Sequence, residues 1–312
     1  MTIEVIKPGL LTTVQDKGRF GLLQYGVIVS GAMDTLSYQI GNLLLQQEDQ
    51  ASLEMTFLGP TLTFHSETII AITGADMKPT LNGLPCPMWR SITIKSGEIL
   101  KFSSAQKGVR SYLAVKDGIQ VEQVLTSRST FLKAGLGGFQ GRALKRGDML
   151  PITTTTTSAL AKTIDISPFK LFENNVTIRL LKGPEYERFT KESHEILENT
   201  MFTVSKDADR MGYRLESTEN LELKEPSSML SEAVTFGTMQ IPPSGQPIIL
   251  MADRQTIGGY PKIAQVATVD LPKLAQLPPY ATIRFQLISL EKAQQLLIDQ
   301  QKYLKLLGIL LK

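Results

Sequence analysis

The chain has 312 residues, of which 42% are hydrophobic and 20% are charged, and its formal net charge is +3. This composition is typical of a globular protein with an ample hydrophobic core, and the length predicts two domains or one large domain. Because the net charge is small and no long basic run is present, nucleic acid is not expected as a partner.

The low cysteine and histidine content limits the chemistry that the chain can carry. Cys86 is the single cysteine, so an intramolecular disulfide is excluded and a reducing, cytoplasmic location is expected. With only His65 and His194, we expect no histidine-based metal site. The N-terminus lacks the pattern of a signal peptide, and no run of about 18 apolar residues is present. We therefore expect no membrane partner.

Short strands are predicted along most of the chain. In chain order, the segments rich in β-branched or apolar residues are 61–64, 69–72, 92–94, 99–102, 176–180, 201–204 and 282–285. Turn signals such as Asn82-Gly83 and Ser96-Gly97 separate several of these segments. Many short strands with regular turns predict a barrel or a sandwich.

Three helices are predicted among these strands. The first begins after Asp34, whose side chain is expected to cap it. The second spans about residues 185–197, and the third runs from about Leu290 toward the C-terminus. The threonine run at residues 153–157 is the best linker candidate. We therefore predict a β domain over residues 1–155, a second β domain over 165–290, and a helix or tail over 291–312.

Residues 244–262 carry the strongest functional signal in the sequence. An apolar run at 248–251 reads as a buried strand, and the polar residues Asp253, Arg254 and Gln255 follow it directly. A flexible glycine pair comes next, and the stretch ends at Lys262. Strand ends on a rigid scaffold often carry binding or catalytic groups. A solvated turn followed by a plain hairpin loop is the alternative interpretation of the same residues.

Several standard chemistries are not supported by the motifs. The chain has no P-loop and no GxSxG nucleophile elbow. The glycine cluster at 135–141 has Gln140 where a dinucleotide fingerprint needs its third glycine, so we interpret it as a loop between strands. The segment 31–34 lacks the lysine that would carry biotin. Asp16 and Asp34 are credible turn and cap residues without a catalytic role.

A set of ordered motifs is more specific than any single one. In chain order they are TVQDKGRFG, YGVIVSGAMD, LEMTFLGPTLTF, ITGAD, DRMGYRL, LSEAV, PPSGQPIILMADRQTIGGYPKIA and DLPKLAQLPP. Over roughly residues 1–290 the chain resembles the C subunit of bacterial ATP-dependent 5-oxoprolinase, a family also known as KipI antagonists or biotin-dependent carboxyltransferases. It is similar to the second half of the carboxyltransferase domain of urea amidolyase, often labelled allophanate hydrolase subunit 2.

This resemblance implies a mainly β fold of two cyclophilin-like β-barrel domains with a few short helices. It implies two partner proteins of the same 5-oxoprolinase, a KipI-like protein (the B subunit) and a protein that resembles lactam-utilisation proteins (the A subunit). The implied reaction is the ATP-driven opening of 5-oxo-L-proline to L-glutamate. ATP with Mg²⁺ is then a co-substrate, and no covalent biotin is expected on this chain.

The resemblance also places the candidate site on polar residues of its motifs. Those with an expected catalytic role are Arg210, Glu232, Asp253 and Lys262. Those expected to bind substrate are Ser231, Gln240, Arg254, Gln255, Gly258, Gly259 and Tyr260. Arginine and lysine are expected to hold phosphate or carboxylate, the carboxylates to act as base or to bind magnesium, and the amides to orient the substrate.

One departure from the family pattern lies inside this set. Ala233 stands where we expect the glycine of an SEG motif, so the backbone there must avoid a positive φ or absorb strain. Two other functions stay open. One alternative to the 5-oxoprolinase subunit is a carboxyltransferase half that receives carboxyl groups from biotin on another chain. The other is a binding protein that sequesters a KipI-like regulator of a sensor kinase, a role that is compatible with an enzymatic one.

Overall fold

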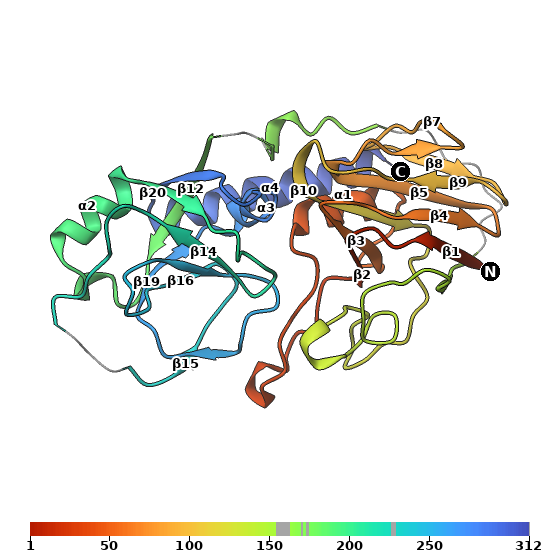
Figure 1. Ribbon diagram of the computed structural model, residues 1–312. Helices are drawn as coiled ribbons and strands as arrows, with labels where there is room; N and C mark the ends of the chain where they lie inside the picture. Colours follow the sequence, from red (N-terminus) through yellow and green to blue (C-terminus); the bar gives the residue numbers. More distant parts are fainter. Residues whose placement is uncertain (154–162, 170, 173–174, 226–228, 312) are drawn as a thin grey trace. The chain divides into compact units, whose positions relative to one another are not determined.

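The computed structural model describes residues 1–153, 163–169, 171–172, 175–225 and 229–311. The chain divides into two compact units, each built from separate stretches of sequence (Figure 1). The N-terminal unit comprises Met1–Phe20, Ser30–Phe172 and Tyr303–Lys312, and the C-terminal unit comprises Gly21–Val29 and Glu173–Lys302. Residues 154–157 of the predicted linker lie outside the described residues. The domain boundaries given above stay predictions.

The strands of the N-terminal unit form two sheets. The six-stranded sheet has the order β11-β1-β4-β9-β6-β7, with β1 (Thr2–Lys7), β4 (Thr61–Phe64), β6 (Thr80–Leu81), β7 (Leu84–Pro85), β9 (Ile99–Lys101) and β11 (Met149–Pro151). The five-stranded sheet has the order β2-β3-β10-β5-β8, with β2 (Leu11–Gln15), β3 (Ser52–Thr56), β5 (Thr68–Asp76), β8 (Ser91–Ile94) and β10 (Lys107–Val115). Neighbouring strands in both sheets are antiparallel.

One hydrophobic core joins these two sheets. In β1 the buried residues alternate, so that Ile3 and Val5 point inward, as the period of two in a strand requires. They pack with Leu53 of β3 and Leu113 of β10 in the same cluster. The predicted strands at 61–64, 69–72, 92–94 and 99–102 are thereby confirmed.

Helix α1 (Thr35–Leu44) covers the other face of the five-stranded sheet. Its apolar residues Leu36 and Ile40 pack against Ala71 of β5 and Ala114 of β10. Asp34 caps the helix, because its Oδ1 accepts a hydrogen bond of 2.9 Å from the Ser37 backbone N–H. The predicted cap is confirmed. With helix on one side and sheet on the other, β5 is buried along almost its whole length.

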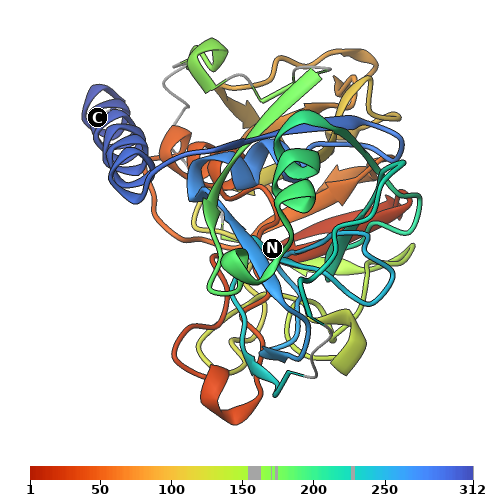
Figure 2. The same ribbon diagram turned by 90° about the vertical axis from the view of Figure 1, so that its left-hand side faces the viewer.

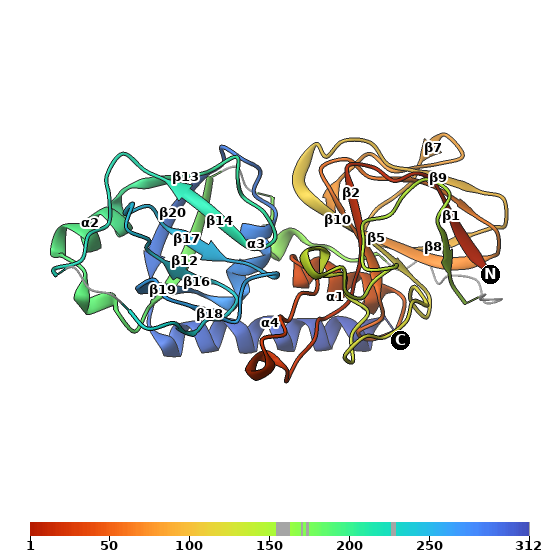
Figure 3. The same cartoon turned by 60° about the horizontal axis from the view of Figure 1, so that its bottom comes forward.

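The C-terminal unit is a closed barrel of seven strands, which Figure 3 shows labelled together. The order around the barrel is β12-β19-β16-β17-β14-β13-β20, with β12 (Asn175–Lys182), β13 (Met201–Val204), β14 (Gly212–Glu216), β16 (Thr238–Gln240), β17 (Ile248–Leu250), β19 (Lys262–Val266) and β20 (Thr282–Leu287). A parallel pairing of β12 with β20 closes it. The predicted mainly β fold is confirmed, and this unit has the predicted barrel.

The remaining helices differ in part from the sequence prediction. The predicted helix at 185–197 is two elements, a 3-10 turn over Tyr186–Arg188 and α2 (Lys191–Asn199). Thr190 caps α2 by accepting from the Ser193 N–H at 3.1 Å, which sets a new helix start inside the predicted span. Helix α3 (Leu271–Ala275) is short, and α4 (Leu290–Leu310) confirms the predicted C-terminal helix, which Figure 2 shows as one continuous element.

Candidate functional site

The polar residues after β17 are placed by the register of the barrel. Strand β17 pairs with β14 so that Leu250 lies opposite Gly212. Asp253 follows the end of β17 and Arg210 precedes the start of β14, so the pairing brings these two predicted residues side by side. Both are buried. The buried strand predicted at 248–251 is confirmed, and it does end in buried charged groups rather than in a solvated turn.

Arg210 and Asp253 form a two-point ion pair. Arg210 Nε donates to Asp253 Oδ2 and Nη2 donates to Oδ1, both at 2.9 Å. The side chains are 8% and 7% exposed. A backbone hydrogen bond of 2.7 Å from Asp253 N–H to the Arg210 carbonyl fixes the same junction. Each charge is compensated by the other, which is the condition under which such groups stay buried.

Arg254 is buried beside this pair without a carboxylate of its own. Its Nη1 donates to the Met251 carbonyl at 3.3 Å, and its guanidinium lies 5.8 Å from the centre of the Phe236 ring. Its buried Nε has no hydrogen-bond acceptor among the described residues. Burial lowers the pKa of the Arg254 guanidinium to about 10, and the nearby Asp253 charge opposes this shift only in part.

Lys262 is the centre of a second charged cluster. Its Nζ lies 2.5 Å from Glu232 Oε2 and 3.7 Å from Glu185 Oε1. The Glu185 side chain also accepts from the Lys262 backbone N–H at 2.9 Å. The Lys262 side chain is 8% exposed and the Glu232 side chain is 57% exposed, so the lysine is buried and its carboxylate partner is open to solvent. The hydrogen bond from Lys262 lowers the pKa of the Glu232 carboxyl.

A small two-stranded sheet brings Glu232 to this position. Strand β15 (Glu232–Ala233) pairs with β18 (Ile257–Gly258), with Glu232 opposite Gly258 and Ala233 opposite Ile257. Ala233 is extended in this strand and does not have a positive φ. The alanine therefore fits where the family pattern led us to expect a glycine.

The glycine pair after β17 allows a close approach to Gln240. The buried Gln240 donates from Nε2 to the Tyr260 carbonyl at 3.1 Å. A Cβ on Gly258 would lie 2.6 Å from that Nε2, whereas a Cβ on Gly259 would lie 3.3 Å from Ser231 Oγ and 3.6 Å from the Met229 carbonyl oxygen. Ser231 is exposed and Gln255 is half-buried. Sequence reasoning had named all of these residues.

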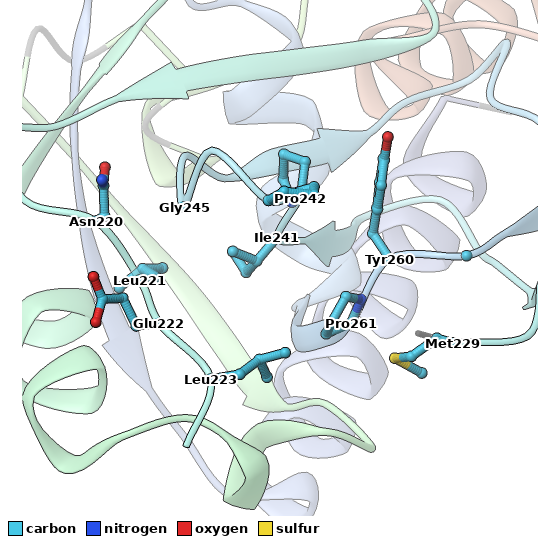
Figure 4. A pocket seen from close by; sticks show the side chains of 12 residues that line it. Asn220, Leu221, Glu222, Leu223, Met229, Ile241, Pro242, Gly245, Tyr260 and Pro261 are labelled. Atoms are coloured by element: carbon cyan, nitrogen blue, oxygen red, sulfur yellow. The ribbon is translucent and has the colours of Figure 1, made fainter. Parts of the chain in front are cut away.

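A pocket of about 660 Å³ opens next to this loop (Figure 4). Its wall is mostly apolar, with Leu221, Leu223 and Ile241 around the hollow and the polar ends of Asn220 and Glu222 on one side. Gly259 and Tyr260 from the predicted set line it.

Sequence reasoning missed these wall residues and also Glu185. Glu185 reaches Lys262 because β12 and β19 are antiparallel and Lys182 lies opposite Ala264, so the residues that follow Lys182 lie beside those that precede Ala264. No local motif indicates this register, so no sequence signal pointed to Glu185.

The polar motif near the N-terminus has a structural role. Asp16 accepts hydrogen bonds from Gly18 N–H at 2.8 Å, Ser127 Oγ at 2.7 Å and Arg128 N–H at 2.5 Å. These bonds fasten the loop at 127–129 to the end of β2. The interpretation of Asp16 as a turn residue agrees with this arrangement.

Two negative findings apply to the described part of the chain. It contains no helix that is both long and apolar enough to cross a membrane. Nor does it contain a group of three or more His, Cys, Asp or Glu side chains placed to hold a metal ion.

Comparison with known proteins shows the class to which this fold and site belong. The sequence model of the family described as "Carboxyltransferase domain, subdomain A and B" matches residues 25–287, and the chain belongs to this family. Within it, the chain is 41% identical to the C subunit of 5-oxoprolinase from Haemophilus influenzae, over 97% of this chain and 96% of that protein. It is 38% identical to the C subunit of 5-oxoprolinase from Escherichia coli, over 98% and 97%. The resemblance found in the sequence is confirmed.

A solved structure supports the fold independently. The crystal structure of the Kluyveromyces lactis urea amidolyase matches with a TM-score of 0.90 and 31% identity. The match covers 98% of this chain but 20% of that much longer one. The urea amidolyase therefore shares the fold of this chain as one part of a larger protein.

Proposed function

We propose that the chain is the C subunit of an ATP-dependent 5-oxoprolinase and acts in the cytoplasm with a KipI-like partner and a lactam-utilisation-like partner. The observation that carries this proposal is the end-to-end similarity to the Haemophilus influenzae protein, at 41% identity over 97% of this chain and 96% of that protein. An alignment that covers both proteins almost completely favours the role of the whole protein rather than of a shared module.

The chemistry of the substrate explains the need for ATP. A five-membered lactam is an amide, and its carbonyl carbon is a poor electrophile. Transfer of the terminal phosphoryl group of ATP to the carbonyl oxygen releases ADP and makes that oxygen a good leaving group. Water then adds to the carbon, and the ring C–N bond breaks as the nitrogen takes a proton, which leaves an acyl phosphate. A second water hydrolyses this acyl phosphate, which yields glutamate and releases phosphate.

The two charged clusters support different roles in this scheme. Asp253 is held at both oxygens by Arg210, so its use as a base would first break a buried ion pair. Glu232 is half in solvent, and its bond to Lys262 lowers its pKa and keeps it ionised. We therefore assign the Lys262–Glu232 pair to charge stabilisation and proton transfer at the lactam, and the Arg210–Asp253 pair to positioning.

Gln240 and Gln255 keep their proposed role in orienting the amide. Gln240 is buried and directed to the loop at Tyr260, where a substrate amide could exchange with the backbone carbonyl. Because the described residues offer no cluster of three ligands, Mg²⁺ would be held by the phosphates of ATP and at most one or two carboxylates.

Reconstitution with the two partner proteins tests the proposal. Purified wild-type chain is combined with the KipI-like and lactam-utilisation-like partners, 5-oxoproline, ATP and Mg²⁺, and the release of ADP and glutamate is followed. We expect both products only when all three proteins are present. Tight binding of the KipI-like partner without any turnover would instead favour the role of an antagonist that sequesters a KipI-like protein.

A carboxyltransferase function is the second candidate. The observation that favours it is the TM-score of 0.90 with the urea amidolyase of Kluyveromyces lactis. In that case the reconstituted system would require a biotin carboxylase and a biotin carrier and would consume urea. Consumption of urea in the absence of any glutamate from 5-oxoproline would replace the first proposal by this one.

A further inference from the structure

Three arginines of the C-terminal unit can be compared by the same edge of the guanidinium group, the edge formed by Nε and Nη2. In Arg210 this edge holds the two oxygens of Asp253, both at 2.9 Å. In Arg179 it holds the two oxygens of Asp270, at 2.7 and 2.6 Å. In Arg254 the buried Nε has no hydrogen-bond partner among the described residues, the one hydrogen bond described for its guanidinium comes from Nη1, and the residue is 7% exposed.

An open edge of this kind is costly in a folded protein. Arginine has five N–H donors, and Arg254 uses one of them, in a long bond to the Met251 carbonyl. A buried donor without an acceptor, on a group that keeps its charge, destabilises the fold. The charge of the neighbouring Asp253 compensates Arg254 only in part, and both of its oxygens already accept hydrogen bonds from Arg210.

We infer that the Nε–Nη2 edge of Arg254 is a binding site for a planar carboxylate ligand. The matching edges of Arg179 and Arg210 show that this chain repeatedly fills such an edge with a carboxylate. The guanidinium lies over the Phe236 ring, 5.8 Å from its centre, so the ring contacts its face rather than this edge. The identity of the ligand rests on the proposed function, under which the carboxylate is that of 5-oxoproline. Arg254, and not Arg210, then selects an acidic lactam.

Ligand-induced stabilisation of the full chain tests this site without the partner proteins. The midpoint of thermal unfolding is measured with acetate, 5-oxo-L-proline, pyrrolidin-2-one and inorganic phosphate at constant ionic strength. We expect acetate and 5-oxoproline to raise the midpoint. Pyrrolidin-2-one, which is the same lactam without the carboxylate, should leave it unchanged.

Three variants connect the effect to the residue. Arg254→Met should abolish the stabilisation by both carboxylates. Arg214→Met, a matched control at an exposed position of β14, should retain it. Arg254→Lys keeps a positive charge but loses the two parallel N–H donors of the guanidinium, so the affinity for carboxylate should fall about tenfold. This third variant preserves the test if the methionine variant does not fold.

The outcomes separate this inference from the proposed function. Full stabilisation in Arg254→Met, equal affinity in Arg254→Lys, or stabilisation by phosphate but by neither carboxylate would overturn the carboxylate site. The same holds if neither carboxylate stabilises the wild type. If the carboxylate effect depends on Arg254 but the reconstituted complex makes no glutamate from 5-oxoproline, the site stands and the proposed substrate falls.

Discussion

At the scale of single residues, the charge partners decide what each side chain can do. The sequence placed Asp253 directly after a buried strand and among the groups that could act as base. It could not reveal that Arg210 occupies both carboxylate oxygens, because that contact depends on the pairing of β14 with β17 and joins residues 43 positions apart. The residue type predicts which chemical roles a side chain can have, and the strand register decides which partner it contacts and so which of these roles it can fill.

Substitution of the two neighbouring arginines should have opposite consequences for stability. Arg210→Met leaves the Asp253 carboxylate buried and without its main partner, which should cost about 3–5 kcal/mol. Arg254→Met removes a poorly compensated charge, so we expect a change of no more than about 1 kcal/mol, or a gain. Chemical denaturation of the ligand-free chain measures both. An equal loss in the two variants would contradict this description of the cluster.

The pH dependence of stability should reveal a second buried carboxylate. Burial raises the pKa of Asp270, but the hydrogen bonds from Arg179 and the charge of Lys273 outweigh it and hold the pKa below 3.8. A depressed pKa in the folded state contributes stability that is present above the usual value and is lost as the pH falls through the folded one. The free energy of unfolding of the wild type should therefore drop as the pH falls below 3.8.

In Asp270→Asn this acid-induced drop should be smaller, because the group that titrates is gone. The variant will also be less stable at neutral pH, where the ion pair with Arg179 is lost. Asp207→Asn, at an exposed position, is the control and should keep the wild-type slope. Parallel pH profiles for the wild type and Asp270→Asn would show that Asp270 is not a source of the acid sensitivity.

At the scale of secondary structure, the sequence predicted an element correctly where the signal lies within the element itself. The cap at Asp34 and the long helix from Leu290 were both predicted, and both are present. The second helix was predicted as one piece over about residues 185–197, whereas the structure has a 3-10 turn and then α2. Thr190 caps a new helix there, and Phe189 pairs instead with Leu223, a contact that only the folded barrel provides.

The glycine loop after β17 offers a matched pair of substitutions. Neither Gly258 nor Gly259 has a positive φ, so alanine is allowed by the backbone at both positions. Gly258→Ala would place a Cβ 2.6 Å from the Gln240 amide and displace it, and lactam-dependent ADP release should fall about tenfold or more. Gly259→Ala would place a Cβ 3.3 Å from the Ser231 hydroxyl and 3.6 Å from the Met229 carbonyl oxygen, so the rate of ADP release should stay within about twofold. Equal rates in both variants would remove Gln240 from the site.

At the scale of the whole molecule, the order of segments along the chain does not show which segments belong to the same compact unit. The mainly β character follows from the many short strands, whereas the length alone left two domains or one large domain open. The assignment of Gly21–Val29 to the C-terminal unit, and of the end of α4 to the N-terminal unit, follows from neither. Such exchanges join segments that are far apart in sequence, and no periodicity within a segment predicts them.

The family-level motifs carried the functional prediction further than any local pattern. Taken alone, residues 253–262 read equally well as a surface turn. Their order behind the other motifs indicated a family that the comparisons then showed. The structure adds that this stretch builds two charged clusters, one closed around Asp253 and one partly open at Glu232.

The central claim is that this chain provides a working site for lactam cleavage to its partner proteins. The most direct test measures glutamate formed from 5-oxoproline when the KipI-like and lactam-utilisation-like partners are combined with the wild-type chain or with Lys262→Ala. We predict glutamate and ADP with the wild type and loss of both with the variant, because the Glu232 carboxylate then lacks its partner. Equal glutamate formation with either chain, or with no chain added, would contradict the account.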